Sequence, residues 1–223
     1  MTLPVPDSPS SARTRLIEAA IFCFAEKGFD ATGIREIAKR ANANSALVQY
    51  HFAGKEGLYR EALASIFQRR PARVAKPPAD PTEPDARSRA IAGVGEMIES
   101  LVLELMSCNN GSPLDQASLF LVTRELQAPH PDAIPLILDH VRPYAEHMEA
   151  CLRILRPDLS KELQLNLVMS IYGQVFHLHS SLAMIRIMRQ DPDFPRDLQA
   201  IIRHFTEFSL RGIGIPEAFP FQA

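Results

Sequence analysis

The chain has 223 residues, of which 46% are hydrophobic and 22% are charged, and none is tryptophan. It is long enough to bury a substantial core in one or two domains. No run of eighteen apolar residues occurs, and residues 1–10 lack the basic-then-apolar order of a signal peptide. We therefore expect a cytoplasmic protein without a membrane span.

Charge is unevenly distributed along the chain. The whole sequence carries a net charge of −2, but residues 11–70 contain ten Lys or Arg against six Asp or Glu, a net of +4, which leaves −6 for the remainder. A basic segment attached to an acidic one is typical of a unit that meets a polyanion. The division indicates nucleic acid as a partner of the N-terminal part.

The residues that would carry catalysis or bind metal are not arranged for either task. Cys23, Cys108 and Cys151 are odd in number, far apart and without a CxxC pair, which excludes a disulfide framework or zinc site and suggests small core residues. No nucleophile motif, metal-spaced His/Cys/Asp set or glycine-rich phosphate loop occurs. We therefore expect neither an enzyme nor a cofactor.

Apolar residues recur at helical spacing in almost every window, and strand-like alternation is nearly absent, which predicts an all-α fold. The Pro- and Ser-rich residues 1–10 are predicted to be disordered. A first helix begins at Ala12, with Ser10 or Ser11 as its cap, and ends at Gly28, because glycine commonly follows the last helical residue.

Two short helices follow. Thr32 is predicted to cap the first of them, which ends near residue 40, and Asn44 to cap the next, at 45–51. The turn between them contains Asn42, a residue type that tolerates the left-handed conformation. A helix–turn–helix arrangement results.

A longer helix is predicted over residues 55–70, and five prolines within 71–84 indicate a connector. Pro143 is expected to kink or split the third of the helical windows beyond it. Those windows cover residues 85–107, 113–127, 132–155, 160–190 and 196–211. The predicted parts are a disordered tail at 1–10, a helix-turn-helix DNA-binding domain at 11–70, the connector at 71–84, a larger helical domain at 85–212, and a C-terminal tail at 213–223.

A helix-turn-helix unit places its second helix in the major groove of DNA. Four apolar residues of that helix and of the turns beside it are predicted to face inward: Ala43, Leu47, Val48 and Phe52. Asn44, Ser45, Ala46, Gln49 and Tyr50 then project outward. Among these, Gln49 suits the donor and acceptor of an adenine edge, and Ser45 can bond to either type of base.

The remaining DNA candidates are predicted to contact phosphate. Thr32 and Lys55 stand at predicted helix starts, where anions are favoured, and Tyr50 and His51 add side-chain donors. Arg35 completes the set of residues that are predicted to bind DNA.

Residues 12–70 resemble the N-terminal domain of TetR-type (tetracycline-repressor-like) transcriptional regulators. The resemblance is carried by four stretches: Arg15-Leu16-Ile17-Glu18-Ala19-Ala20, Phe24-Ala25-Glu26-Lys27-Gly28-Phe29, Ala31-Thr32-Gly33-Ile34-Arg35-Glu36-Ile37-Ala38, and Tyr50-His51-Phe52-Ala53-Gly54-Lys55-Glu56-Gly57-Leu58-Tyr59. Membership implies a homodimeric, all-helical repressor whose C-terminal domain binds a small molecule and thereby alters the spacing of two DNA-binding heads.

The sequence departs from the family pattern around the recognition helix. The usual turn Ala-Gly-Val-Ser is here residues 41–44, Ala-Asn-Ala-Asn, and the common Leu-Tyr before the His-Phe pair is replaced at residues 48–50 by Val-Gln-Tyr. The recognition helix, with Thr123-Arg124-Glu125-Leu126 and a following Pro-rich bend, most resembles the CecR-like branch. These departures affect which operator is bound.

The C-terminal domain contains a polar stripe at helical spacing, formed by Ser170, Gln174, His177 and Ser181. Two interpretations stay open: a solvated or dimer-facing strip, or polar groups that line a ligand pocket. His177 and His179 are two residues apart, so they cannot chelate one metal ion from a helix.

Arg124 is a further ligand candidate, because a charge at the edge of an apolar helix either pairs internally or meets an acidic ligand. We favour an internal pair with Glu125.

The predicted function is a homodimeric repressor that binds a palindromic operator in double-stranded DNA and is released by a small-molecule effector. The dimer is predicted to form through the apolar faces of residues 160–190 and 196–211, in a four-helix interface. A helical enzyme or lipid carrier, and an adaptor that has lost contact with DNA, are the alternatives.

Overall fold

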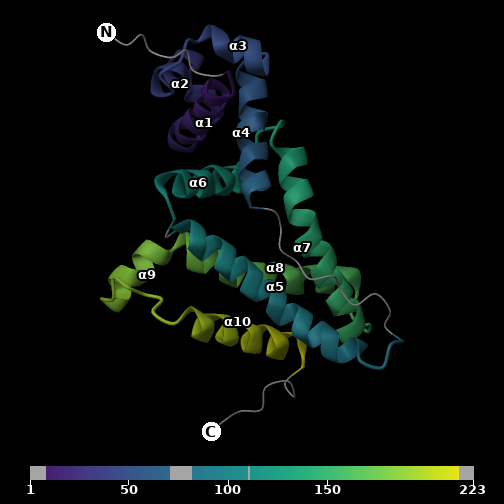
Figure 1. Ribbon diagram of the computed structural model, residues 1–223. Helices are drawn as coiled ribbons and strands as arrows, with labels where there is room; N and C mark the ends of the chain where they lie inside the picture. The colour runs from purple at the N-terminus through teal and green to yellow at the C-terminus, as the bar shows by residue number, and fades with distance from the viewer. Residues whose placement is uncertain (1–8, 71–81, 110, 216–223) are drawn as a thin grey trace. The chain divides into compact units, whose positions relative to one another are not determined.

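The computed structural model describes residues 9–70, 82–109 and 111–215, and the regular elements in these ranges are all α-helices (Figure 1). The all-α prediction is confirmed. The helices are α1 (Pro9–Ala31), α2 (Ile34–Arg40), α3 (Ala46–Phe52), α4 (Lys55–Arg69), α5 (Ala86–Asn109), α6 (Pro113–Gln127), α7 (Ile134–Leu155), α8 (Lys161–Ser180), α9 (Leu182–Arg189) and α10 (Leu198–Ile213).

Contacts between helices divide the chain into two compact units. The head unit comprises residues 1–71 and 107–140, and the body unit comprises residues 72–106 and 141–223. The predicted C-terminal domain covered residues 85–212, whereas the contacts group α6 and the first residues of α7 with the N-terminal helices. A helix that is distant in sequence therefore belongs to the same compact unit as α2 and α3.

Several predicted helix ends differ from the observed ones. Helix α1 already begins at Pro9, so Ser10 and Ser11 lie inside the helix rather than capping it. The window at 160–190 is broken at Ser181, which separates α8 from α9. Helix α7 continues through Pro143 without being split.

The predicted tails and connector lie largely outside the described residues, which exclude 1–8, 71–81 and 216–223. Where the C-terminal tail was expected to begin, α10 continues to Ile213, and Ile215 is buried in the body-unit core. Both side chains are apolar, so their burial extends the core by two positions.

Helix α1 is the centre of the head unit. Leu16, Ala20 and Phe24 are fully buried along it at helical spacing, and the helix packs against both α4 and α6. The ring of Phe24 meets Tyr59 of α4 edge-on, with centroids 4.9 Å apart. Burial and the nearby Glu125 carboxylate of α6 raise the pKa of the Tyr59 hydroxyl. Both helices therefore complete the core around α1.

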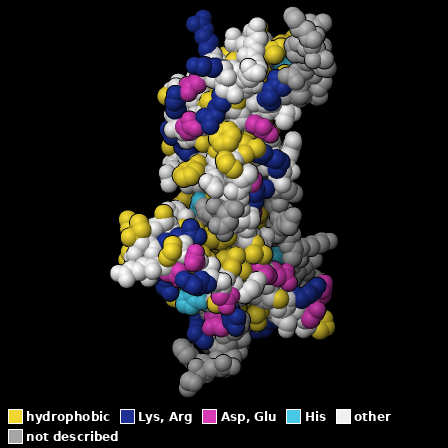
Figure 2. Space-filling view, turned by 60° about the vertical axis from the view of Figure 1, so that its left-hand side comes forward, with side chains coloured by type: hydrophobic (Ala, Val, Ile, Leu, Met, Phe, Trp, Pro, Cys, Tyr) yellow, Lys and Arg dark blue, Asp and Glu magenta, His cyan; other side chains and the backbone are white. Residues whose placement is uncertain are grey.

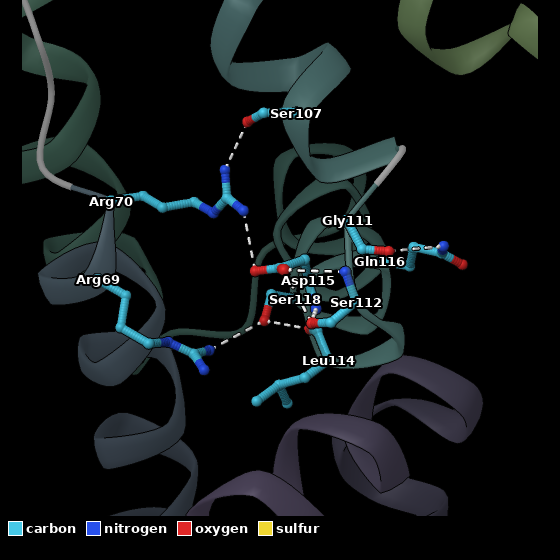
Figure 3. A network of polar contacts seen from close by, with 9 residues as sticks. All are labelled: Arg69, Arg70, Ser107, Gly111, Ser112, Leu114, Asp115, Gln116 and Ser118. Carbon is cyan, nitrogen blue, oxygen red and sulfur yellow. Dashed lines mark hydrogen bonds and ion pairs between the residues drawn. The ribbon is translucent and has the colours of Figure 1, made fainter.

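Polar contacts attach the end of α4 to α6 (Figure 3). The Arg70 guanidinium donates to Asp115 Oδ1 at 2.9 Å and to Ser107 Oγ at 2.7 Å, and Arg69 donates to Ser118 Oγ at 3.1 Å. Asp115 also accepts the Ser112 backbone N–H in a capping box that begins α6. One carboxylate thus serves both the start of α6 and the end of α4.

The core of the body unit is formed by α5, α7, α8 and α10, with Leu182 from the start of α9. Gly93 of α5 allows close approach by α7, where His147 Nε2 lies 2.9 Å from the Gly93 carbonyl and 3.6 Å from Cys151 Sγ. Burial raises the pKa of Cys151 to about 12. The three cysteines are free and buried, which confirms their interpretation as core residues.

The Arg70–Asp115 ion pair predicts a pH-dependent contribution to stability. The Arg70 guanidinium lowers the pKa of Asp115, so its stabilisation is complete above the ordinary carboxyl pKa, about 3.9, and is lost as pH falls through the lower folded-state value. Asp115→Asn should lower the free energy of unfolding by about 0.5–1 kcal/mol at pH 7, because both partners are partly exposed. Urea titrations at pH 7, 5, 4 and 3 measure this difference.

The difference between wild type and Asp115→Asn should shrink as pH falls below about 4. A double-mutant cycle with Arg70→Gln isolates the pair from the capping role of Asp115. A difference that is constant across this pH series would contradict the ion-pair explanation.

Candidate nucleic-acid interface

Helices α2 and α3 form a helix-turn-helix, as predicted. The chain turns at Asn42, whose φ of 48° confirms the expected left-handed conformation, and the Ala43 N–H donates to the Ala38 carbonyl at 2.9 Å. Asn44 Oδ1 accepts the Ala46 N–H at 2.9 Å, although Ser45 occupies the N-cap position. The turn is thus held by a side chain at the point where α3 begins.

Helix α3 separates its apolar and polar residues as the sequence indicates. Val48 and Phe52 are buried, and Ala43 and Leu47 are half-buried. The five residues predicted to face outward, Asn44, Ser45, Ala46, Gln49 and Tyr50, are all exposed, with Tyr50 at 79%. The structure therefore assembles an uncharged polar surface with one large aromatic ring.

His51 is half-buried at the edge of this surface. Its ring meets Tyr50 edge-on, with centroids 4.9 Å apart, and lies 5.9 Å from the Phe52 ring. Tyr50, His51 and Phe52 therefore form a run of three adjacent aromatic rings at the end of α3.

Thr32 does not present its hydroxyl to the surface, contrary to the prediction. The residue is only 2% exposed, and Oγ1 donates toward the Gly28 carbonyl at 2.7 Å and the Cys23 carbonyl at 3.1 Å. Gly33, not Thr32, is the N-cap of α2. Thr32 satisfies carbonyls where α1 is interrupted, which uses the hydroxyl proton that a phosphate contact would need.

Lys55 is half-buried and turned toward the chain that follows α1. Its ammonium lies 4.4 Å from the Phe29 ring centroid and donates to the Asp30 carbonyl at 3.3 Å. A cation in this position stabilises the α1–α2 connection. Arg35, by contrast, is exposed on α2.

The ligand candidates are distributed over both units. Arg124 lies in the head unit, and the stripe of Ser170, Gln174, His177 and Ser181 lies in the body unit. The Glu125 carboxylate accepts the His130 N–H at 2.8 Å, and the Arg124 guanidinium lies against Gly28. Arg124 and Glu125 therefore contact other groups, and the predicted Arg124–Glu125 pair is wrong.

The polar stripe of α8 is bonded mainly to its own helix. Ser170 donates to the Asn166 carbonyl at 2.9 Å, and Ser181 Oγ lies 3.2 Å from His177 Nδ1. Gln174 alone reaches another helix, donating to Ser209 Oγ of α10 at 3.2 Å. Both interpretations of the stripe stay open.

A polar group that sequence reasoning missed lies in the body unit. The Tyr172 hydroxyl is buried without a hydrogen-bond partner among the described residues, and burial raises its pKa. Tyr172 follows Ile171, which is buried in the body-unit core, and packs against the same core. Its position on α8 was readable from the sequence, but its missing partner was not.

In the part of the chain that the structure describes, no group of His, Cys, Asp and Glu is placed to hold a metal ion. None of the described helices has the length and apolar character needed to cross a membrane.

The geometry of α2 and α3 is that of a helix-turn-helix transcriptional regulator, and comparison with known families agrees. Residues 16–62 match the model described as bacterial regulatory proteins, tetR family. Residues 94–213 match the C-terminal domain of the HTH-type transcriptional dual regulator CecR. Because the second match covers more than half of the chain, the protein belongs to the TetR family of transcriptional regulators, with a C-terminal domain of the CecR type.

Similar relatives match over about a quarter of the chain. The probable HTH-type transcriptional regulator YttP of Bacillus subtilis (strain 168) is 40% identical over 58 residues, which are 26% of this chain and 28% of that protein. IcaR of Staphylococcus epidermidis, a negative regulator of the biofilm operon icaADBC, is 36% identical over 55 residues, 25% of this chain and 30% of the relative. The matches thus span less than a third of either relative.

Solved structures share the fold over most of the chain. HlyIIR, a hemolysin II transcriptional regulator, gives a TM-score of 0.56 at 17% identity, covering 89% of this chain and 99% of that one. A TetR-like regulator from Rhodococcus sp. RHA1 gives 0.56 at 13%, covering 96% and 99%. SmeT in complex with triclosan gives 0.53 at 16%, covering 90% of each.

The break in α1 at Gly28 is a testable feature of this interface. Gly28 has φ 80° and ψ 176°, a conformation essentially restricted to glycine, and an added Cβ would lie 2.5 Å from Arg124 Nη2. Arg124 could move away, but the backbone strain would remain. Gly28→Ala should therefore lower the free energy of unfolding by about 1–3 kcal/mol in urea titrations.

Gly173→Ala is the matched control. Gly173 is exposed within α8, and an added Cβ would meet nothing within 4 Å. That substitution should raise stability by about 0.5–1 kcal/mol. Equal effects of the two substitutions would rule out special strain at Gly28.

Proposed function

We propose that the protein is a homodimeric repressor that binds a palindromic operator through α3 and is released by a small-molecule effector. The observation that carries the proposal is the exposed, uncharged polar face of α3, from Asn44 to Tyr50. Base edges in the major groove are distinguished by such neutral donors and acceptors, and Gln49 suits adenine. The negative regulator IcaR, similar over a quarter of this chain, supports a role as a repressor.

Exposed apolar side chains support the dimer. Leu165 and Met169 of α8 are 53% and 64% exposed, and Phe208 of α10 is 60% exposed. Soluble proteins seldom leave several large apolar side chains exposed on neighbouring helices, and α8 packs on α10. A second copy that places the same two helices against these would form a four-helix interface.

The effector is proposed to bind in the body unit. The unpartnered Tyr172 hydroxyl there is a polar group in apolar surroundings, which is the composition of small-molecule sites. SmeT, which shares the fold, was solved in complex with triclosan. This likeness supports small-molecule binding by analogy. The proposal includes that the protein is cytoplasmic and is not an enzyme.

Binding to DNA from upstream of the protein's own gene tests the proposal, by gel shift and fluorescence anisotropy. The wild type should bind one palindromic segment far more tightly than random duplex. Gln49→Ala should weaken operator binding by about 1–3 kcal/mol and relax the base preference at one position in each half-site.

Gln127→Ala provides the control, since Gln127 is exposed at the end of α6 in the same unit and is not part of the α3 face. It should leave the affinity and the base preference unchanged. Weak wild-type binding with no preference between operator and random duplex would refute the proposal.

A further inference from the structure

The recognition helix lacks the charge that DNA binding needs. Residues 41–54, which include the turn and all of α3, contain no Lys or Arg. Affinity for DNA comes largely from cations that neutralise backbone phosphates and release their counterions. The cations beside the recognition helix must therefore come from other helices of the head, which include α1, where the Arg13 guanidinium lies 5.4 Å from the Phe52 ring centroid.

Most cations of the head are already engaged. Arg13, Lys27 and Arg40 pair with Glu61, Glu36 and Glu26 at 2.5, 2.5 and 2.7 Å. Arg60 pairs with Asp132, Arg15 donates to the Ala41 carbonyl, and the two arginines of Figure 3 hold α6. In the space-filling view, Lys and Arg side chains are interspersed with Asp and Glu over the N-terminal helices (Figure 2). The net charge of +4 is thus a poor measure of what remains for a ligand.

Two cations of residues 11–70 have no hydrogen bond or ion pair to any residue that the structure describes. They are Arg35 and Lys39, both exposed and both on α2. Four residues apart, they share the face opposite the buried Ile37 and Ala38. Like charges at this spacing repel each other and destabilise a helix. Neither side chain forms an ion pair with a described acidic residue, so a polyanion is a partner that this face fits.

We propose that Lys39, together with Arg35, contacts the DNA backbone beside the recognition helix and contributes to the salt-sensitive affinity of the head. This inference rests on the proposed function. Lysine acts as a compact point charge toward phosphate, and a contact to phosphate carries no direct sequence information. Lys39 therefore strengthens binding to every DNA sequence alike, whereas Gln49 selects among them.

Lys55 has a different role in this account. Its ammonium is held over the Phe29 ring and bonded to the Asp30 carbonyl, so it maintains the chain between α1 and α2. Removing its charge should lower the thermal midpoint of the head without changing the number of phosphates that the protein neutralises.

The salt dependence of DNA affinity tests the assignment. Anisotropy is measured from 50 to 200 mM salt with full-length protein, on labelled DNA from upstream of its own gene and on a random 30-bp duplex. Each phosphate contact contributes about 0.9 to the slope of log K against log salt, a factor of about 3.5 over this range. Lys39→Gln should reduce the slope by about 0.9 per subunit on both DNAs.

Two variants serve as controls. Lys161→Gln makes the same charge change at an exposed position in α8 of the body unit and should leave the slope at the wild-type value. Lys55→Gln should also leave the slope unchanged while lowering the thermal midpoint. Circular dichroism checks that Lys39→Gln remains folded, as its exposed and unpartnered side chain predicts.

The outcomes separate this inference from the proposed function. Wild type that binds neither DNA overturns both. Wild type that binds its upstream DNA, with a Lys39→Gln slope equal to its own, overturns the assignment of Lys39 alone. An equal loss of slope in Lys161→Gln or Lys55→Gln overturns it as well, because the effect would then follow overall charge or position near α4.

Discussion

The head unit depends on the packing of α1 between α4 and α6. Helices α2 and α3 have seven residues each, too few to be stable in isolation, so they keep their shape only by packing on longer helices. Phe24 and Tyr59 fill the space between α1 and α4, while Glu125 of α6 lies close to the Tyr59 hydroxyl. The recognition helix is therefore positioned in part by a helix more than sixty residues further along the chain.

This dependence explains how the head divides its polar residues. Thr32 and Lys55 stabilise the chain where α1 is interrupted at Gly28, and the arginines at the end of α4 hold α6. Contacts that keep the head folded thus occupy residue types that also suit DNA. What remains exposed is a neutral polar face on α3 and a short basic face on α2, which is the division that the proposed base reading and phosphate binding require.

Local features of this head were predictable from the sequence because they depend on neighbouring residues. Asn42 adopts the left-handed turn, and Gln49 and Tyr50 face outward, as spacing and residue type indicate. Non-local features were not predictable. Periodicity does not say that the Thr32 hydroxyl turns back to the Gly28 carbonyl, or that α6 packs with α1, since both depend on segments brought together only by folding.

The central claim, that α6 is part of the DNA-binding head, is tested most directly by native-state hydrogen exchange in low denaturant. Residues that unfold together share the free energy and the denaturant dependence of opening. The account predicts that amides of α6 open together with those of α1 and α4. Amides of α6 that instead open together with those of α8 and α10, while α1 and α4 remain protected, would contradict it.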